Sequence, residues 1–163
     1  MQNFNKILVF DMDGTIFDFY GVEGWQHYLD DLQDPTPYAI AKPFYNPAEL
    51  NLIINQLRAQ GWYIVVNTWL SKFKTEAFHA AIREVKLQRL ADIQFPYDYF
   101  IATDYGVDKQ LPFVNITDGI QIIVDDNSDI RNAWNGPTID ATQNIIPALK
   151  QLLIKDLEVD YDK

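Results

Sequence analysis

Two carboxylates one residue apart, Asp11 and Asp13, follow directly after the apolar run Ile-Leu-Val-Phe at residues 7–10. A glycine and a threonine, Gly14 and Thr15, come next. Desolvating carboxylates at the tip of a buried strand is costly unless a metal ion, a cation or hydrogen bonds offset the cost. One chemistry open to such a pair is a nucleophilic carboxylate beside a proton-transferring one, above a bound magnesium ion.

Two other interpretations of the acid pair compete with this one. A calcium-binding loop also begins Asp-x-Asp, but it needs glycine at its sixth position and glutamate at its twelfth. Those positions hold Ile16 and Val22, which argues against a calcium loop. A structural turn, in which the acids accept hydrogen bonds from nearby amides, stays open on these residues alone.

Two further apolar runs also end in polar residues. One leads into Asn67 and Thr68, and the run at 120–124 ends in Asp125 and Asp126. The carboxyl ends of parallel strands share one edge of a sheet, and ligands of open α/β sheets bind at that edge. Each feature alone also fits a helix or turn cap, but together they predict a site.

The elements that must position these residues alternate between strand and helix. Hydrophobic periodicity and turn signals predict the following boundaries. Strands are expected at residues 7–10, 62–66, 97–103, 120–124 and 136–140, and helices at 23–32, from the Asn46 cap to Gly61, and at 75–90, 109–115, 128–134 and 145–157. This order predicts a three-layer α/β/α Rossmann-like fold with a mostly parallel sheet. The length suits a single domain over residues 1–163.

The order of the motifs resembles the haloacid dehalogenase (HAD) superfamily of phosphatases along almost the whole chain. The resemblance rests on Asp-Met-Asp-Gly-Thr, a strand ending in Asn-Thr, a later lysine, and Val-Asp-Asp-Asn. It implies that Asp11 attacks phosphorus and becomes an aspartyl-phosphate. It also implies that Asp13 protonates the leaving oxygen and then activates water.

The resemblance further implies a phosphate-binding group and a magnesium site. Thr68 corresponds to the residue that binds the transferring phosphoryl group, and Lys109 to the lysine that neutralises it. The expected substrate-binding residues are Gly14, Thr15, Asn67, Thr68 and Lys109, and the expected magnesium ligands are Asp11, Asp13 through its backbone carbonyl, Asp125 and Asp126.

Two further lysines and one further aspartate leave the phosphate-neutralising lysine and the acidic set open. Lys72 and Lys74 follow Thr68 closely, and either is an alternative to Lys109 as the phosphate-neutralising lysine. Asp129 adds a third acid at a related Asp-x-x-x-Asp spacing.

Residues 17–46 are irregular and rich in aromatic side chains. They are expected either to pack against the core or to form a small cap whose rings line a substrate pocket. Larger HAD members insert whole cap domains, so the resemblance implies a fairly open site here, or one covered by a small lid or a partner subunit. The motifs are also similar to those of small 5′-nucleotidases of the family, and the aromatic residues could stack a base. No role is assigned to His27.

Composition limits the class of protein. The formal net charge of −10 opposes nucleic-acid binding, which depends on neutralising phosphates. The chain has no cysteine, no apolar stretch of membrane-spanning length and no signal-peptide pattern at its start. A cytoplasmic protein is therefore expected, with a small phosphorylated molecule as substrate and no membrane or nucleic-acid partner. The oligomeric state stays open.

The predicted function is that of a magnesium-dependent phosphomonoester hydrolase acting on nucleotides or other small phosphometabolites. A catalytically silent HAD-like binding or scaffold protein and a phosphatase acting on a macromolecule are the alternatives. A response-regulator receiver would carry its acidic pair first and its acceptor aspartate on a middle strand, which is not the order here. Dinucleotide and nucleoside-triphosphate sites need glycine-rich motifs that the chain lacks.

Overall fold

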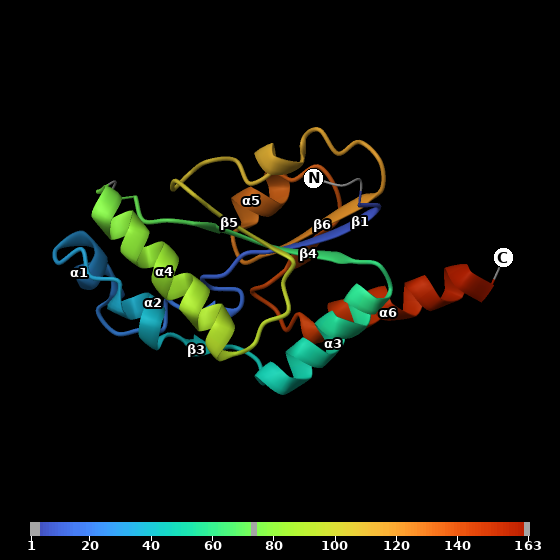
Figure 1. Ribbon diagram of the computed structural model, residues 1–163, viewed down its shortest axis with the longest axis horizontal. Coiled ribbons are helices and arrows are strands. Elements are labelled where there is room, and N and C mark those ends of the chain that lie inside the picture. The colour runs from blue at the N-terminus through green and yellow to red at the C-terminus, as the bar shows by residue number, and fades with distance from the viewer. Residues whose placement is uncertain (1–3, 73–74, 162–163) are drawn as a thin grey trace.

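The computed structural model describes residues 4–72 and 75–161. Its centre is a five-stranded parallel sheet in the order β5-β4-β1-β6-β7 (Figure 1). The strands are β1 (Lys6–Phe10), β4 (Tyr63–Trp69), β5 (Tyr99–Thr103), β6 (Ile120–Asp125) and β7 (Thr138–Asp140). After β1 the chain builds the sheet toward β5, and then returns to add β6 and β7 on the other side. The point where this direction reverses lies between β1 and β6, which is where ligands of such sheets bind.

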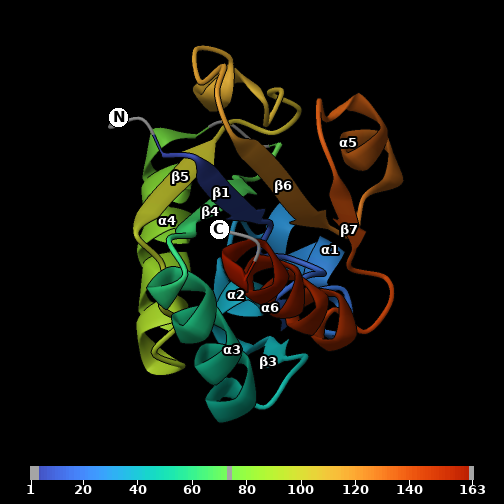
Figure 2. The ribbon, with the colours of Figure 1, turned by 90° about the vertical axis from the view of Figure 1, so that its right-hand side faces the viewer.

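Helices cover both faces of the sheet (Figure 2). One face packs against α3 (Pro47–Ala59), α4 (Glu76–Asp92) and α6 (Ile146–Tyr161). The other face packs against the 3-10 helix η1 (Leu111–Phe113) and α5 (Ser128–Ala133). This arrangement confirms the predicted α/β/α Rossmann-like fold.

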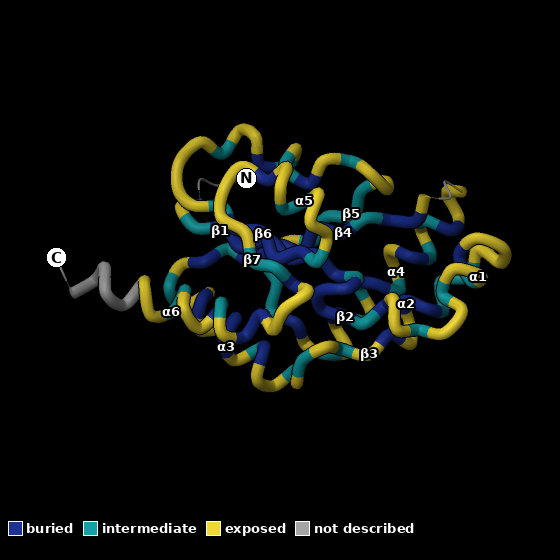
Figure 3. Tube along the Cα trace, turned by 180° about the vertical axis from the view of Figure 1, so that it is seen from behind, coloured by how far each residue is buried: buried dark blue, intermediate teal, exposed yellow. Residues whose placement is uncertain are grey.

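The central strand β1 joins the two cores on either side of the sheet. Ile7 and Val9 pack into the smaller core with Trp134, whereas Leu8 and Phe10 belong to the larger core beneath α3 and α6. All four side chains are fully buried, and the burial is concentrated on the central strands in Figure 3. An unbroken apolar run is what a parallel strand buried on both faces requires.

The strand register brings the carboxyl ends of the three central strands together. Phe10 at the end of β1 pairs with Val66 of β4 and with Val124 of β6. The amide of Asp11 then donates to the Val124 carbonyl at 2.9 Å, so the alignment continues one residue beyond β1. The residues that follow β1, β4 and β6 therefore lie side by side at the carboxyl edge of the sheet.

The segment at residues 17–46 contains four short elements. β2 (Phe17–Asp18) and β3 (Lys42–Pro43) pair antiparallel, with α1 (Trp25–Asp30) and α2 (Thr36–Ile40) between them. The sequence predicts α1 but treats the proline-rich run before α2 as a break. Asp34 instead starts α2, because its carboxylate accepts from the Thr36 amide at 2.8 Å and from the Thr36 hydroxyl at 2.6 Å.

Several other boundaries differ from the sequence predictions. The strand expected at 62–66 extends to Trp69, since β5 pairs with it that far. The helix expected at 109–115 is reduced to η1. Thr75 is the N-cap residue of α4, as the sequence predicts, but its hydroxyl donates to Gln33 at 3.0 Å and makes no hydrogen bond to the first turn of the helix. His79, expected in solvent, is largely buried and lies 2.9 Å from the Ser71 carbonyl oxygen.

No helix in the described ranges is both long enough and apolar enough to cross a membrane.

The cap of α3 gives a test of the fold. The Asn46 side chain accepts hydrogen bonds from the amides of Ala48 at 2.9 Å and Glu49 at 3.4 Å. We expect Asn46→Ala to lower the free energy of unfolding by about 1 kcal/mol, because two helix-end amides lose their acceptor. Thermal denaturation should show a fall of roughly 2–4 °C.

The matched control is Asn55→Ala, the same substitution at an exposed position inside α3. It should leave the melting temperature equal or slightly higher, because alanine favours helix interiors. Equal losses in the two variants would contradict the capping role.

Candidate active site

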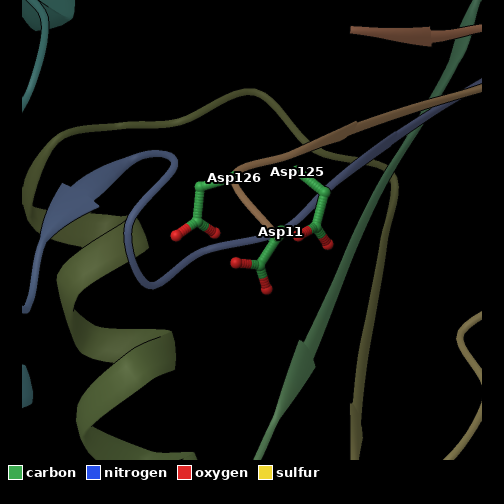
Figure 4. Close-up of side chains that lie close together, drawn as sticks. All are labelled: Asp11, Asp125 and Asp126. Carbon is green, nitrogen blue, oxygen red and sulfur yellow. The ribbon is translucent and has the colours of Figure 1, made fainter. Parts of the chain in front are cut away.

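Three carboxylates gather at the carboxyl edge of the sheet. Asp11 follows β1, Asp125 ends β6, and Asp126 comes next, with one oxygen from each within 4.8 Å of the others (Figure 4). Asp11 and Asp125 are buried, and Asp126 is half-buried. Magnesium takes oxygen ligands at roughly 2.1 Å in an octahedron. Three oxygens this close need only small side-chain rotations to reach one such ion, so the donor set fits magnesium.

The loop after β1 folds tightly against this acid cluster. The Met12 carbonyl accepts from the amides of Thr15, Ile16 and Phe17, and the Gly14 amide donates to the Phe17 carbonyl at 2.8 Å. Gly14 has a left-handed φ of 81°, and a Cβ built there would lie 2.4 Å from an Asp126 carboxylate oxygen. Only glycine therefore allows the loop this conformation and this close an approach to the acids.

Lys109 lies inside the cluster. Its Nζ donates to Asp11 Oδ1 at 2.6 Å and to Asp125 Oδ2 at 2.7 Å, and the side chain is almost fully buried. The backbone carbonyl of Lys109 accepts from Asn67 Nδ2 at 3.0 Å. The lysine that chain order predicts is thus the one beside Asp11, and Asn67 fixes the loop that carries it.

A second buried lysine, Lys86 of α4, was not predicted. Its Nζ donates to Asp13 Oδ2 at 2.5 Å, to Thr68 Oγ1 at 2.8 Å and to the Trp69 carbonyl at 2.8 Å. Lys86 is fully buried. The carboxylates of the acid pair are therefore each bound by a lysine, and the structural-turn interpretation does not account for these contacts.

The sequence did contain a signal for Lys86. The buried residues of α4 are spaced four apart at Phe78, Ile82, Lys86 and Leu90. A lysine in the middle of an apolar stripe cannot reach solvent easily, so it needs a buried acceptor.

Burial and mutual repulsion raise the pKa values of the acids. Burial raises the pKa of Asp13, the Lys86 ammonium opposes the rise, and Asp11 adds to it. Burial and the neighbouring Asp11 raise the pKa of Asp125 to about 7 despite Lys109, and that of Asp126 to about 6. Burial alone would lower the pKa of Lys109, but Asp11 and Asp125 raise it above its ordinary value.

A cavity of about 210 Å³ opens above the acids. Asp11, Asp13 and the acidic pair form its floor together with Lys109. Aromatic side chains line it: Phe19, Tyr20, Trp25 and Tyr38 from residues 17–46, Trp69 at the end of β4, and Tyr105 after β5. Phe19 and Tyr38 also pack against α4, so they serve both the core and the cavity.

Some predicted residues do not reach the cavity. The predicted substrate-binding residues Gly14, Thr15, Asn67 and Thr68 are buried and do not line it. Asp129 is exposed in the first turn of α5 and is not one of the three acids of the cluster. Lys72 lines the cavity from an exposed position 3.9 Å from Asp30. Lys74 lies outside the described residues.

Comparisons with known proteins support the fold but no family assignment. No protein-family model and no curated protein matches the sequence. Two solved structures of the Pnkp1/Rnl/Hen1 RNA repair complex contain similar chains, with TM-scores of 0.57 and 0.58, identities of 16% and 15%, and 86% of this chain covered in each. This chain spans less than half of those chains, 43% and 47%.

A complete phosphatase is also similar. The D,D-heptose 1,7-bisphosphate phosphatase of B. bronchiseptica, solved with magnesium and phosphate, has a TM-score of 0.50 and 12% identity, with 92% of this chain and 99% of that chain covered. At such identities the likeness concerns the fold alone. This chain shares with these proteins a three-layer α/β/α fold around a parallel sheet.

The raised carboxylate pKa values predict how magnesium binding depends on pH. The folded protein holds protons on Asp125 and Asp126 up to about pH 7 and about pH 6, whereas the unfolded chain loses them near the ordinary value of 3.8. Without metal, these groups stabilise the fold fully below pH 4, and the contribution is lost as pH rises toward 7. Magnesium binds the ionised carboxylates, so its affinity should increase over the same interval.

We therefore expect the magnesium-induced rise in melting temperature to be larger at pH 8 than at pH 5. Asp126→Asn should reduce the rise, whereas Asp129→Asn, with the same charge change outside the cluster, should preserve it. A pH-independent rise would contradict this account.

Proposed function

We propose that the protein is a magnesium-dependent phosphomonoester hydrolase that acts through an aspartyl-phosphate on Asp11. One observation carries the proposal: Asp11 and Asp13, two residues apart on one loop, are held by two different buried lysines beside an acidic pair. An anionic nucleophile that approaches an anionic phosphate needs cationic groups close by. Lys109 is one such group, and the acid cluster can hold another.

The first half of the reaction forms the covalent intermediate. A carboxylate oxygen of Asp11 attacks phosphorus while the bond from phosphorus to the ester oxygen breaks. Asp13 in its acid form gives its proton to that departing oxygen. Burial, which raises the pKa of Asp13, favours its acid form.

The second half restores the enzyme. The Asp13 carboxylate takes a proton from a water molecule, whose oxygen attacks the phosphorus of the aspartyl-phosphate. The bond between phosphorus and Asp11 breaks, and inorganic phosphate leaves. Lys109, held between Asp11 and Asp125, keeps the attacking carboxylate in place through both halves.

Magnesium would be held by Asp11, Asp125 and Asp126, with the backbone carbonyl of Asp13 as a further ligand. When bound, it would neutralise charge on the transferring phosphoryl group.

We further propose that residues 17–46 act as a small cap and that the substrate is a small phosphate ester with a flat leaving group, such as a nucleotide. The cavity of about 210 Å³ is lined by several aromatic side chains. The net charge of −10 disfavours a long polyanion. A nucleic-acid end is the second candidate, because similar chains occur in an RNA repair complex.

The nucleophile is tested by Asp11→Asn. We expect magnesium-dependent release of p-nitrophenol from p-nitrophenyl phosphate to fall at least 10³-fold, because the amide cannot form the aspartyl-phosphate. Asp129→Asn is the control and should keep native activity. Undiminished activity in Asp11→Asn would require another nucleophile.

The aromatic wall is tested by Tyr105→Ala. Tyr105 is 56% exposed and lies 5.0 Å from the Trp69 ring, centroid to centroid. If the rings stack a base, kcat/KM for nucleoside monophosphates should fall about tenfold, consistent with roughly 1–3 kcal/mol per stacked base. The values for sugar phosphates should change little.

Tyr99→Ala is the matched control, since Tyr99 is similarly exposed on β5 but does not line the cavity. Equal effects on both substrate classes would exclude base stacking. Faster turnover of a 3′- or 5′-phosphorylated oligonucleotide than of any monophosphate would favour the nucleic-acid candidate.

A further inference from the structure

Lys86 has a complete set of hydrogen-bond acceptors inside the protein. An ammonium group has three protons to donate, and Nζ of Lys86 donates to Asp13 Oδ2, Thr68 Oγ1 and the Trp69 carbonyl. The Tyr38 ring centroid lies 4.7 Å from the same nitrogen. No proton is left for a phosphate oxygen, so Lys86 is not a second phosphate-binding lysine.

Stability alone does not explain a lysine at this position. Its neighbours on the buried stripe of α4 are Ile82 and Leu90, and a methionine would continue that stripe. Replacing both members of a buried ion pair by apolar side chains of similar size is often neutral or stabilising, so the fold does not need the pair for its stability. The reason for Lys86 must therefore be sought in the groups that it holds.

One of those groups, Asp13, belongs to the proposed reaction, and the other, Thr68, lies beside it at the end of β4. Asp13 Oδ2 accepts from the ammonium, so the other carboxyl oxygen, Oδ1, is left to exchange a proton with the substrate. The Thr68 hydroxyl also accepts from Lys86, is fully buried, and donates to the Trp69 carbonyl at 3.5 Å. Lys86 therefore ties Asp13 to the end of β4.

We propose that Lys86 is a positioning residue that fixes Asp13 to protonate the leaving oxygen. This proposal rests on the proposed function. It gives the two lysines separate tasks. Lys109 contacts the proposed attacking carboxylate and Asp125, whereas Lys86 contacts the proposed proton donor and the Thr68 hydroxyl.

The test compares two phosphate esters that differ in their need for a proton. p-Nitrophenolate leaves readily without protonation, whereas the alkoxide of glycerol 1-phosphate does not. Lys86→Met keeps most of the side-chain volume and removes the ammonium. We expect its kcat on glycerol 1-phosphate to fall on the order of 10²-fold more than its kcat on p-nitrophenyl phosphate, which is the size of a general-acid contribution.

Two controls separate positioning from general damage. Arg83→Met removes one positive charge from an exposed site on α4, where Arg83 donates to the Ala102 carbonyl, and should keep both activities. Asp13→Asn should show the same preference for the good leaving group as Lys86→Met, and the double variant should show no larger preference. The magnesium-induced rise in melting temperature should persist in Lys86→Met, because Lys86 contacts none of the acid-cluster side chains.

The outcomes are distinct. Equal losses on the two esters, or no loss on either, would overturn the role of Lys86 while leaving an active phosphatase. A native protein that hydrolyses neither ester would overturn the proposed function and the role of Lys86 with it. If Lys86→Met does not fold, Lys86→Gln replaces it, and the same difference between the two esters is expected.

Discussion

Four aspartates share a small volume at one edge of the sheet, and their mutual repulsion must be offset for the chain to fold there. Two buried lysines do so from different directions. Lys109 arrives from the loop after β5 and joins Asp11 to Asp125, whereas Lys86 arrives from α4 and joins Asp13 to the end of β4. Removing one partner of such a buried pair leaves an uncompensated charge. These ion pairs, together with packing, therefore fix the positions of the loop after β1 and of helix α4 relative to the edge of the sheet.

This pairing also bears on the alternatives to catalysis. A binding or scaffold protein could keep the sheet while filling its edge with apolar or neutral side chains, which would avoid the desolvation of four acids and two lysines. A receiver domain would place its acceptor aspartate away from the first strand. Here the buried charges are arranged around Asp11 on the central strand, at the reversal point between β1 and β6. Such an arrangement of buried charges is not needed for a scaffold role, and it supports the proposed phosphatase activity.

The parts of the fold that the sequence predicts are those governed by local pattern. The apolar run of β1 and the Asn46 cap before α3 each have one clear interpretation, and the strand ends place Asp11 and Asp125 by topology alone. The sequence does not predict α2, because prolines usually interrupt helices. In the structure the Asp34 carboxylate accepts from the amide of Thr36, the first residue of that helix. A local sequence pattern does not indicate which hydrogen-bond acceptors a side chain meets in a distant part of the chain.

Lys86 illustrates that limit most clearly. Its partners Thr68 and Asp13 lie 18 and 73 residues away along the chain, so no window of sequence contains the contact. A lysine in a helix is ordinarily solvent-facing, and only its place between Ile82 and Leu90 indicates otherwise. Asn67 shows the opposite case. It was expected at the substrate, but its amide is used by the Lys109 carbonyl.

The short β2–β3 pair has a consequence for how this chain could change in evolution. Phe17 pairs with Pro43 and Asp18 with Lys42, so the chain leaves the sheet edge and returns to it at neighbouring points. Any length of polypeptide can join two points that already lie side by side, and the entropy of closing a longer loop grows only slowly. The segment between them is thus free to lengthen or to be exchanged for a larger module, while a one-residue insertion in β1 would swap its two buried faces.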